Sequence, residues 1–261
     1  MVEKAKSLLS RFYILLIILF LYAPIAVLII LSFNDSRSRV VWGGFTLRWY
    51  VDLLHNNQIR AALATTFLLA FLSAFISLVI GTAAALGISS MKRRNHKLLM
   101  MITNIPMLNA DIVTGIALML WIIQFMPLGF CSVLIAHISF NIPYVILAVL
   151  PKVKTMNISI YNAGRDLGAG PLRAFFELML PQLWGGMLSG FFMAFTMSMD
   201  DFVITYFTKG AGVNTLSTMI YGEIKKGIKP EIYALSTIIF VLVLVILMVV
   251  NNVPSKERRE K

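Results

Sequence analysis

The sequence predicts an all-α integral membrane protein that crosses the bilayer six times, and three observations lead to this fold class. Of the 261 residues, 59% are hydrophobic and 13% are charged, whereas an ordinary soluble domain has about a quarter of its residues charged. The apolar residues stand in continuous runs, much longer than the segments of about ten alternating residues that build a membrane β-barrel. A helix also satisfies its own backbone hydrogen bonds in lipid, so helices are the expected way to cross.

Several apolar runs are long enough to span a membrane, which takes roughly 20 residues of helix. The first is longer than the core of a signal peptide, about 7–15 residues, so we expect it to remain as a membrane anchor. The third and fourth are separated only around Met126 and predict a tight helical hairpin. Together the runs predict a single transmembrane domain over residues 1–261, with spans at about 12–33, 61–88, 98–125, 127–150, 183–208 and 232–251.

Lysine and arginine are distributed unevenly between the two sides of the predicted bundle. The N-terminus, the 89–97 and 151–182 connections and the C-terminal tail together carry 15 of them, and the opposite side carries 8. Cytoplasmic segments of membrane proteins carry the excess of positive charge, so we expect both termini and the 151–182 connection to be cytoplasmic. The net charge of +11 comes from residues that flank apolar runs, so it predicts no nucleic-acid partner.

The 151–182 connection contains a polar segment between two long apolar runs. Asn162 is a residue type that caps helices, and Asp166 follows four residues later. Ala163 and Gly164 carry almost no side chain, so another surface could approach the backbone there closely. We therefore expect this stretch to be a short helix that contacts a partner.

The second half of the same segment predicts a turn and another helix. Gly168, followed by Ala169, permits a backbone conformation that other residues resist, and Pro171 suits a helix start. Pro181 is expected to mark the return of the chain into the membrane. Helix, glycine turn and helix would then lie at the cytoplasmic face, although the residues alone fit an interfacial amphipathic loop equally well.

Asp111 is the one charged residue within the third apolar run. It lies 13 residues after Leu98, about 20 Å along a helix, and Pro106 and Asn109 before it predict a broken helix. An ionisable group inside a membrane is costly unless it is paired or hydrated, and it commonly marks a substrate pathway. A buried side chain hydrogen-bonded to neighbouring helices is the alternative.

Two adjacent carboxylates, Asp200 and Asp201, stand near the end of the fifth run. With Tyr206 nearby they suit an amine cation, because carboxylates supply charge and aromatic faces supply cation–π attraction. The alternative is that the pair caps a helix break. Trp121 is a candidate aromatic wall of the same pathway, although aromatic residues at the membrane interface have the same sequence signature. His137 is expected to be a hydrogen-bonded structural histidine rather than a ligand.

The sequence contains no metal-ligand cluster, no nucleophile–base pair and no phosphate-binding glycine loop. We therefore expect no catalytic residue, no metal site and no cofactor in this chain, and any ATP chemistry must come from another chain. Cys131 is the single cysteine, which excludes an intrachain disulfide.

The 162–181 segment resembles the "EAA loop" of permease subunits in ATP-binding-cassette importers. The family pattern runs Glu-Ala-Ala, three residues, Gly-Ala, then an apolar run ending in Leu-Pro. The chain departs from the pattern at Asn162, where the family usually has Glu, and at Gly164, where it has the second Ala. The residues that match are Ala163, Gly168, Ala169, Leu180 and Pro181.

Further stretches are similar to the second permease subunit of bacterial spermidine/putrescine importers, the PotC type. They are residues 31–37 (LSFNDSR), 42–50 (WGGFTLRWY), 111–113 (DIV), 128–130 (LGF) with 137–140 (HISF), and 198–201 (SMDD). The resemblance implies a MetI-like, type I importer bundle in the bacterial inner membrane. It also implies a homologous second permease, an extracytoplasmic polyamine-binding protein, and an ATPase dimer that binds ATP and Mg and docks on the 162–181 segment.

Two other functions remain open from the sequence. One is the same architecture with another solute, such as thiamine, iron or an anion. The other is a channel or secondary carrier that works without an ATPase.

Overall fold

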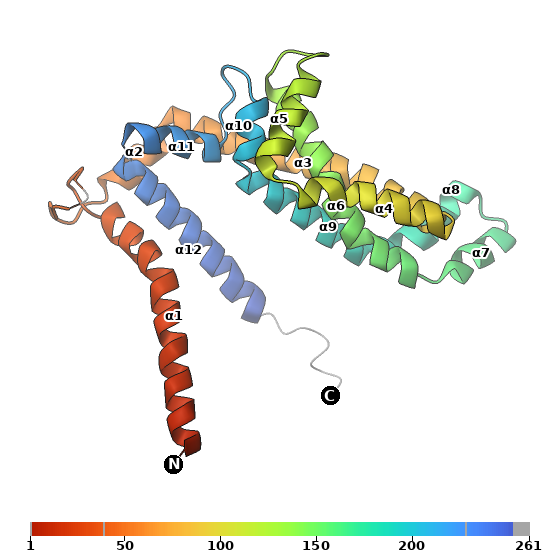
Figure 1. Cartoon of the computed structure of the whole chain (residues 1–261), viewed down its shortest axis with the longest axis horizontal. Helices are drawn as coiled ribbons and strands as arrows, with labels where there is room; N and C mark the ends of the chain where they lie inside the picture. The colour runs from red at the N-terminus through yellow and green to blue at the C-terminus, as the bar shows by residue number, and fades with distance from the viewer. Residues whose placement is uncertain (1, 39, 228, 253–261) are drawn as a thin grey trace. The chain divides into compact units, whose positions relative to one another are not determined.

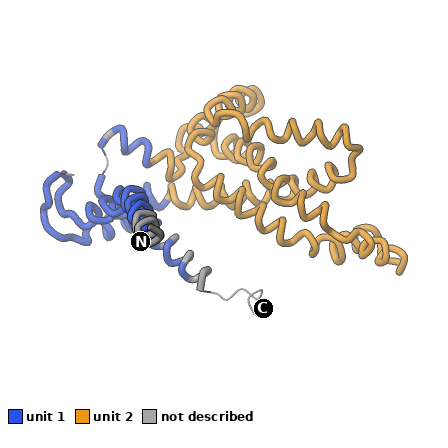
Figure 2. Tube along the Cα trace, turned by 60° about the horizontal axis from the view of Figure 1, so that its bottom comes forward, with its two compact units in different colours: residues 1–60, 220–261 blue, residues 61–219 orange. Residues whose placement is uncertain are grey.

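The computed structural model describes residues 2–38, 40–227 and 229–252 (Figure 1). Within these residues the chain is helical, and its single β feature is an isolated bridge between Asn34 and Phe45. The chain forms two compact units (Figure 2): residues 1–60 with 220–261, and residues 61–219. Both units contain spans predicted from the sequence.

The first unit is built from α1 (Val2–Ser32), α2 (Arg48–His55) and α12 (Pro230–Asn252), and α12 packs against both of the others. The described side chains of α1 between Phe12 and Tyr22 are exposed and apolar around the whole helix. A helix of this kind faces lipid or another apolar helix rather than water. The first predicted anchor is therefore a single continuous helix.

The connection between α1 and α2 is organised around the buried side chain of Asn34. Its amide nitrogen donates to the carbonyl of Val41 at 2.9 Å, and its amide oxygen accepts from the backbone nitrogen of Gly43 at 2.7 Å. The Trp49 indole nitrogen donates to the Asn34 carbonyl at 2.8 Å. Two sequence stretches that carried the family resemblance, 31–37 and 42–50, thus form one hydrogen-bonded connection.

The second unit contains a pair of long, closely packed helices, α6 (Phe130–Thr155) and α9 (Leu180–Asp200). Its apolar core includes Val145, Val149 and Leu183, all fully buried. Small residues allow the approach: a Cβ added at Gly186 would lie 2.8 Å from Cγ of Lys152 on α6. The small residues of the fifth predicted span therefore serve helix packing within the bundle.

The second unit also contains the long helix α3 and several shorter helices. The first residues of α3 and the last residues of α11 belong to the first unit. In chain order they are α3 (Asn57–Ser89), α4 (Arg93–Leu108), α5 (Asp111–Ile122), α7 (Ile158–Asp166), α8 (Pro171–Ala174), the π-helix η1 (Phe175–Met179), α10 (Val203–Thr208) and α11 (Leu216–Lys226).

Four described helices are long and apolar enough to cross a membrane: Arg11–Ser32, Asn57–Ser89, Phe130–Thr155 and Pro171–Asp200. The helices α4 and α5 are apolar and long enough only when taken together, and the pair is bent by 105° at a short break, as in a broken span or a re-entrant loop. The described apolar stretch of α12, Pro230–Val241, is shorter, and it coincides with the sixth predicted span. The helix break predicted from Pro106 and Asn109 is confirmed. The helix that carries the fifth predicted span begins earlier, at Pro171, because α8, η1 and α9 form one continuous helix that ends at Asp200. The bounds of the membrane span itself stay a prediction.

Candidate functional site

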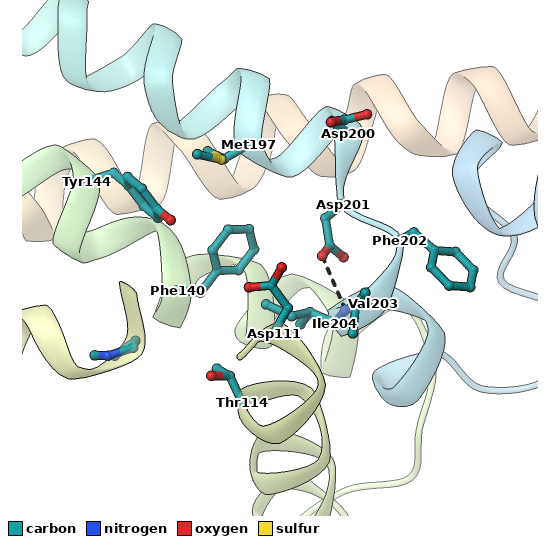
Figure 3. A pocket seen from close by; sticks show the side chains of 11 residues that line it. Asp111, Thr114, Phe140, Tyr144, Met197, Asp200, Asp201, Phe202, Val203 and Ile204 are labelled. Atoms are coloured by element: carbon teal, nitrogen blue, oxygen red, sulfur yellow. Dashed lines mark hydrogen bonds between the residues drawn. The ribbon is translucent and has the colours of Figure 1, made fainter. Parts of the chain in front are cut away.

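A pocket of about 330 Å³ lies in the second unit, where two helix breaks meet (Figure 3). One break separates α4 from α5, and the other separates α9 from α10. The volume is at the lower end of the range for small-molecule sites, about 300–1,000 Å³. The lining residues are Pro106, Asp111, Thr114, Phe140, Tyr144, Met197, Asp200, Asp201, Phe202, Val203 and Ile204.

Each break places the start of a helix at the pocket. Ala110 has an extended backbone before α5, and Asp201 has an extended backbone after α9. The first turn of a helix has backbone N–H groups without intrahelical partners and the positive end of the helix dipole. A carboxylate stands at both starts, Asp111 at α5 and Asp201 before α10. The pocket therefore presents negative charge where bare helix starts would present positive charge.

Asp201 uses its carboxylate mainly for contacts within the chain. One oxygen accepts from the backbone nitrogen of Ile204 at 3.2 Å, the bond drawn in Figure 3. The other accepts from the backbone nitrogen of Thr205 at 2.7 Å and from its hydroxyl at 2.8 Å. It also lies 3.4 Å from Nε2 of His137. The capping of a helix break, which the sequence left open as an alternative, is thus confirmed for Asp201, although the residue also lines the pocket.

Asp111 and Asp200 differ from Asp201 in both exposure and partners. Both are exposed, and neither carboxylate forms a hydrogen bond or ion pair with another described residue. In Figure 3 the Asp111 side chain points into the pocket, beside the ring of Phe140, while Asp200 stands at the end of α9. These two carboxylates therefore keep their hydrogen-bond acceptors open, whereas those of Asp201 are used within the chain.

The pocket residues that α5 and α6 add were not predicted from the sequence. Phe140 and Tyr144, one turn apart on α6, meet edge to face with their ring centroids 6.4 Å apart. Thr114, one turn after Asp111, has a buried hydroxyl oxygen with no hydrogen-bond partner among the described residues. Both helices are mostly apolar and carry other aromatic and hydroxyl residues, so only the position of the two helix breaks singles these three residues out.

Two predicted pathway residues lie outside this lining. Trp121 is exposed and packs on Phe125, with ring centroids 5.2 Å apart. Tyr206 packs on Phe202 at 5.4 Å, so it touches a lining residue without being one itself. The structure therefore brings the three aspartates together but places Trp121 and Tyr206 elsewhere.

The predicted helix, glycine turn and helix of the 162–181 segment are present as α7, a turn and α8 (Figure 1). The capping expectation was wrong: Asn157 caps α7 by accepting from the backbone nitrogen of Ser159 at 3.0 Å. Asn162 lies inside α7 and is exposed, as are Ala163 and Asp166. Because α7 begins five residues earlier than expected, these three residues lie within the helix rather than at its start, and their side chains are exposed.

The turn between α7 and α8 depends on Gly168. Its φ is +90°, in the region that residues with a Cβ rarely adopt. The next residue, Ala169, donates its backbone N–H to the carbonyl of Gly164 at 3.0 Å, and its own carbonyl accepts from Arg165 at 3.0 Å. Pro171 then starts α8. The expectations for Gly168 and Pro171 are confirmed.

Pro181 does not begin a helix of its own, and the expectation that the chain returns to the membrane at this residue stays a prediction. It lies at the start of α9, directly after the π-helix η1, in a helix that continues unbroken from Pro171 to Asp200. Proline lacks the N–H needed for the normal helical bond, and the π-helix just before it is a single-turn departure from regular α-helical bonding within a continuous helix. The short helix and the fifth span are thus mechanically one element.

The space beside Gly164 is filled by another part of the same chain and is not open to a partner. A Cβ added at this position would clash with Cδ1 of Leu178, in η1. The absent side chain therefore lets α7 rest against the helix that leads into the membrane, and the expectation that a separate surface approaches Gly164 is corrected.

This contact predicts the effect of restoring the alanine that the family pattern has at this position. Gly164→Ala is expected to destabilise the chain by about 1 kcal/mol, because the end of the Leu178 side chain must move aside and the better helix propensity of alanine offsets part of that cost; the readout is a lower Tm of the purified protein in detergent. In a Leu178→Ala background the same change should stabilise the chain by about 0.5–1 kcal/mol, because the clashing atoms are gone and only the better helix propensity of alanine remains. An equal loss of Tm in both backgrounds would refute the contact.

Comparison with known proteins places the chain in a family. Residues 77–253 match the family model described as "Binding-protein-dependent transport system inner membrane component". The chain belongs to this family: it is an inner-membrane permease component of an ABC importer and not itself an enzyme.

Several curated relatives have related names. The chain is 34% identical over 230 residues to the spermidine/putrescine transport system permease protein PotC of Escherichia coli K12, covering 88% of this chain and 87% of that protein. It is 33% identical over 228 residues to the putrescine transport system permease protein PotI of the same strain, covering 84% and 81%. To PotC of Haemophilus influenzae it is 30% identical over 253 residues, covering 95% and 98%.

A solved structure supports the fold. One chain of a bacterial alginate ABC transporter, in complex with an alginate pentasaccharide-bound periplasmic protein, superposes with a TM-score of 0.68 at 16% identity, covering 99% of this chain and 97% of that one. At this identity the likeness concerns the fold alone. The predicted type I importer bundle is confirmed by this similarity together with the family match.

Proposed function

We propose that this chain is the permease subunit of an ATP-driven importer that moves polyamines, spermidine or putrescine, into the cytoplasm. The observation that carries the proposal is the pocket with three aspartates and no lysine or arginine among its lining residues. Relatives at 30–34% identity are named as putrescine or spermidine/putrescine permeases, which agrees with a cationic substrate.

The chemistry of the pocket suits a flexible amine with several charges. Asp111 and Asp200 are available to accept hydrogen bonds from ammonium groups, which are stronger than bonds between neutral groups. Phe140 and Tyr144, which also line the pocket, offer apolar and aromatic surface to the carbon chain of a polyamine. Aromatic faces also attract cations. An anionic substrate such as alginate would meet like charge in this pocket.

The other components of the proposed importer are separate chains. We infer a homologous second permease, an extracytoplasmic polyamine-binding protein and a pair of ATPase subunits that bind ATP and Mg. The name of the family points to a binding protein, and the excess of positive charge on one side puts both termini and the α7–α8 turn in the cytoplasm.

Coupling would pass through the segment from Asn162 to Pro181. Its exposed surface includes Asn162, Ala163, Asp166 and the Gly168 turn, and it continues through η1 into α9, whose last residue, Asp200, lines the pocket. A displacement of the turn by the ATPase would therefore reach the pocket through one helix, giving alternating access. Because Asn162 replaces the usual carboxylate, the docking contact there is uncharged on this side.

A competition assay tests the substrate class. Cells expressing the chain with the proteins encoded beside it should accumulate labelled spermidine or putrescine, and unlabelled polyamine should suppress the uptake. Thiamine, ferric iron and alginate should not compete. Suppression by one of these solutes, with polyamines inert, would assign the same architecture to a different substrate.

A further inference from the structure

His137 lies next to the pocket, although it is not part of the lining. It is on α6 and is 0% exposed. Its Nδ1 lies 2.5 Å from the hydroxyl of Ser198 on α9, and its Nε2 lies 2.9 Å from the hydroxyl of Thr205 on α10. A buried histidine that contacts two other helices is positioned to fix the geometry between them.

The direction of the hydrogen bonds on the Thr205 side follows from the contacts of its hydroxyl. That hydroxyl donates its one hydrogen to Asp201 at 2.8 Å, so toward His137 its oxygen can only accept. Nε2 of His137 must therefore carry a hydrogen. The Thr205 hydroxyl relays this donation to the carboxylate.

On the other side of the ring the bonds run the same way. The Ser73 hydroxyl, on α3, donates to Ser198 at 2.9 Å, closer than its alternative acceptor, the carbonyl of Ala70 at 3.2 Å. Ser198 then has its own hydrogen to give to Nδ1 of His137. A single chain of donors thus runs from Ser73 through Ser198, His137 and Thr205 to Asp201.

We propose that His137 is a neutral positioning residue, protonated on Nε2 alone, whose polarised hydrogen-bond chain holds Asp201 as a fixed anion of the pocket wall. Aligned hydrogen bonds strengthen one another in a medium of low dielectric constant. The Asp201 side chain is 9% exposed, so these donors, with the backbone N–H groups of α10, replace the water that an ionised carboxylate would otherwise need.

In this arrangement the three aspartates have different roles. Asp201 contributes charge from the wall while its oxygens bind the chain itself, and Asp111 and Asp200 bind the cation directly. A protonated, positive His137 would cancel the charge of Asp201 and repel a cationic substrate. The hydrogen-bond assignment stands without the proposed function, and only its effect on transport rests on that function.

Nitrogen NMR on the full-length chain in lipid nanodiscs tests the protonation state directly. The chain has three histidines, and with all of them ¹⁵N-labelled, the signals lost in His137→Gln identify His137. At neutral pH we expect one protonated nitrogen, Nε2, and one unprotonated nitrogen, Nδ1. Two protonated nitrogens, or a hydrogen on Nδ1 alone, would overturn the proposal.

A matched pair of variants tests the positioning role. The amide of His137→Gln reaches the place of Nε2 and keeps the contact with Thr205, whereas the shorter His137→Asn reaches only the place of Nδ1. At equal amounts in the membrane, we expect polyamine uptake within about threefold of wild type for Gln and a loss of about tenfold or more for Asn, which leaves buried groups on the Asp201 side without a donor. His96→Gln, a replacement on α4 away from the pocket, should leave uptake unchanged.

Equal uptake by the Gln and Asn variants, whether high or low, would refute the positioning role. Failure of the proposed function would look different, because wild-type chain would then transport no polyamine while the NMR spectrum would still decide the protonation of His137.

Discussion

Replacing Asp111 by asparagine is expected to lower the initial rate of polyamine uptake by about 10- to 100-fold. A hydrogen bond to a charged group contributes about 1.5–3 kcal/mol, and each 1.4 kcal/mol corresponds to about a factor of ten. The substitution keeps the size of the side chain but removes its charge, so the positive end of α5 would face the cation uncompensated.

The stability of the protein should fall much less than the activity. The Asp111 carboxylate forms no hydrogen bond or ion pair with another described residue, so Asp111→Asn should lose only the about 0.3–1 kcal/mol that a carboxylate contributes at a helix N-terminus, a small decrease in Tm beside the loss of uptake. Asp52→Asn, on the exposed face of α2 where Asp52 pairs with Arg48 at 3.4 Å, is the matched control and should transport normally. If Asp111→Asn and Asp200→Asn both transport at the wild-type rate, the acidic pathway does not exist.

Replacing Gly168 by valine is expected to abolish ATP-dependent uptake and the co-purification of the ATPase. Gly168 has a φ of +90°, and forcing a residue with a side chain into this region costs about 1–3 kcal/mol, more for a β-branched one. The turn would therefore change its backbone path and reorient α7 relative to α8. None of the residues that line the pocket belongs to α7 or to this turn, so the pocket should keep its own structure although α9 continues from α8.

Gly170 provides a matched control two residues away. Its φ is −61° and a Cβ added there would meet no atom within 4 Å, so Gly170→Ala should retain both the ATPase and uptake. If Gly168→Val co-purified the ATPase and transported normally, the turn would not be the coupling element. If Gly170→Ala were as damaging as Gly168→Val, the effect would not come from the left-handed backbone of Gly168.

The architecture could be predicted from the sequence because its signals are local. Continuous apolar runs of helical length predict spans wherever they occur, and the broken third span follows from Pro106 and Asn109 beside a charge. The turn at Gly168 follows from a glycine between two helical patterns. The beginning of α7 was misjudged because Asn157 and Asn162 have the same capping ability, and the choice between them depends on packing against η1.

The pocket could be predicted only in part, because it depends on contacts between distant segments. A charge inside an apolar run singles out Asp111, and the Asp200–Asp201 pair is unusual for the same reason. Nothing local indicates that these residues meet, or that Phe140 and Tyr144 complete the lining. The hydrogen-bonded hydroxyl groups around His137 could not be predicted either. Ser73, Ser198 and Thr205 are small polar residues with no distinguishing local pattern, and only the fold brings them together around His137.

The measurement that tests the account most directly is uptake of labelled spermidine into proteoliposomes that contain this chain with its co-purifying permease, ATPase and binding protein. We predict accumulation that requires ATP inside the compartment holding the ATPase, stops when the ATPase is omitted, and is lost in Asp111→Asn. Accumulation by this chain alone, without ATP or partner subunits, would contradict the account and would identify a self-contained channel or carrier.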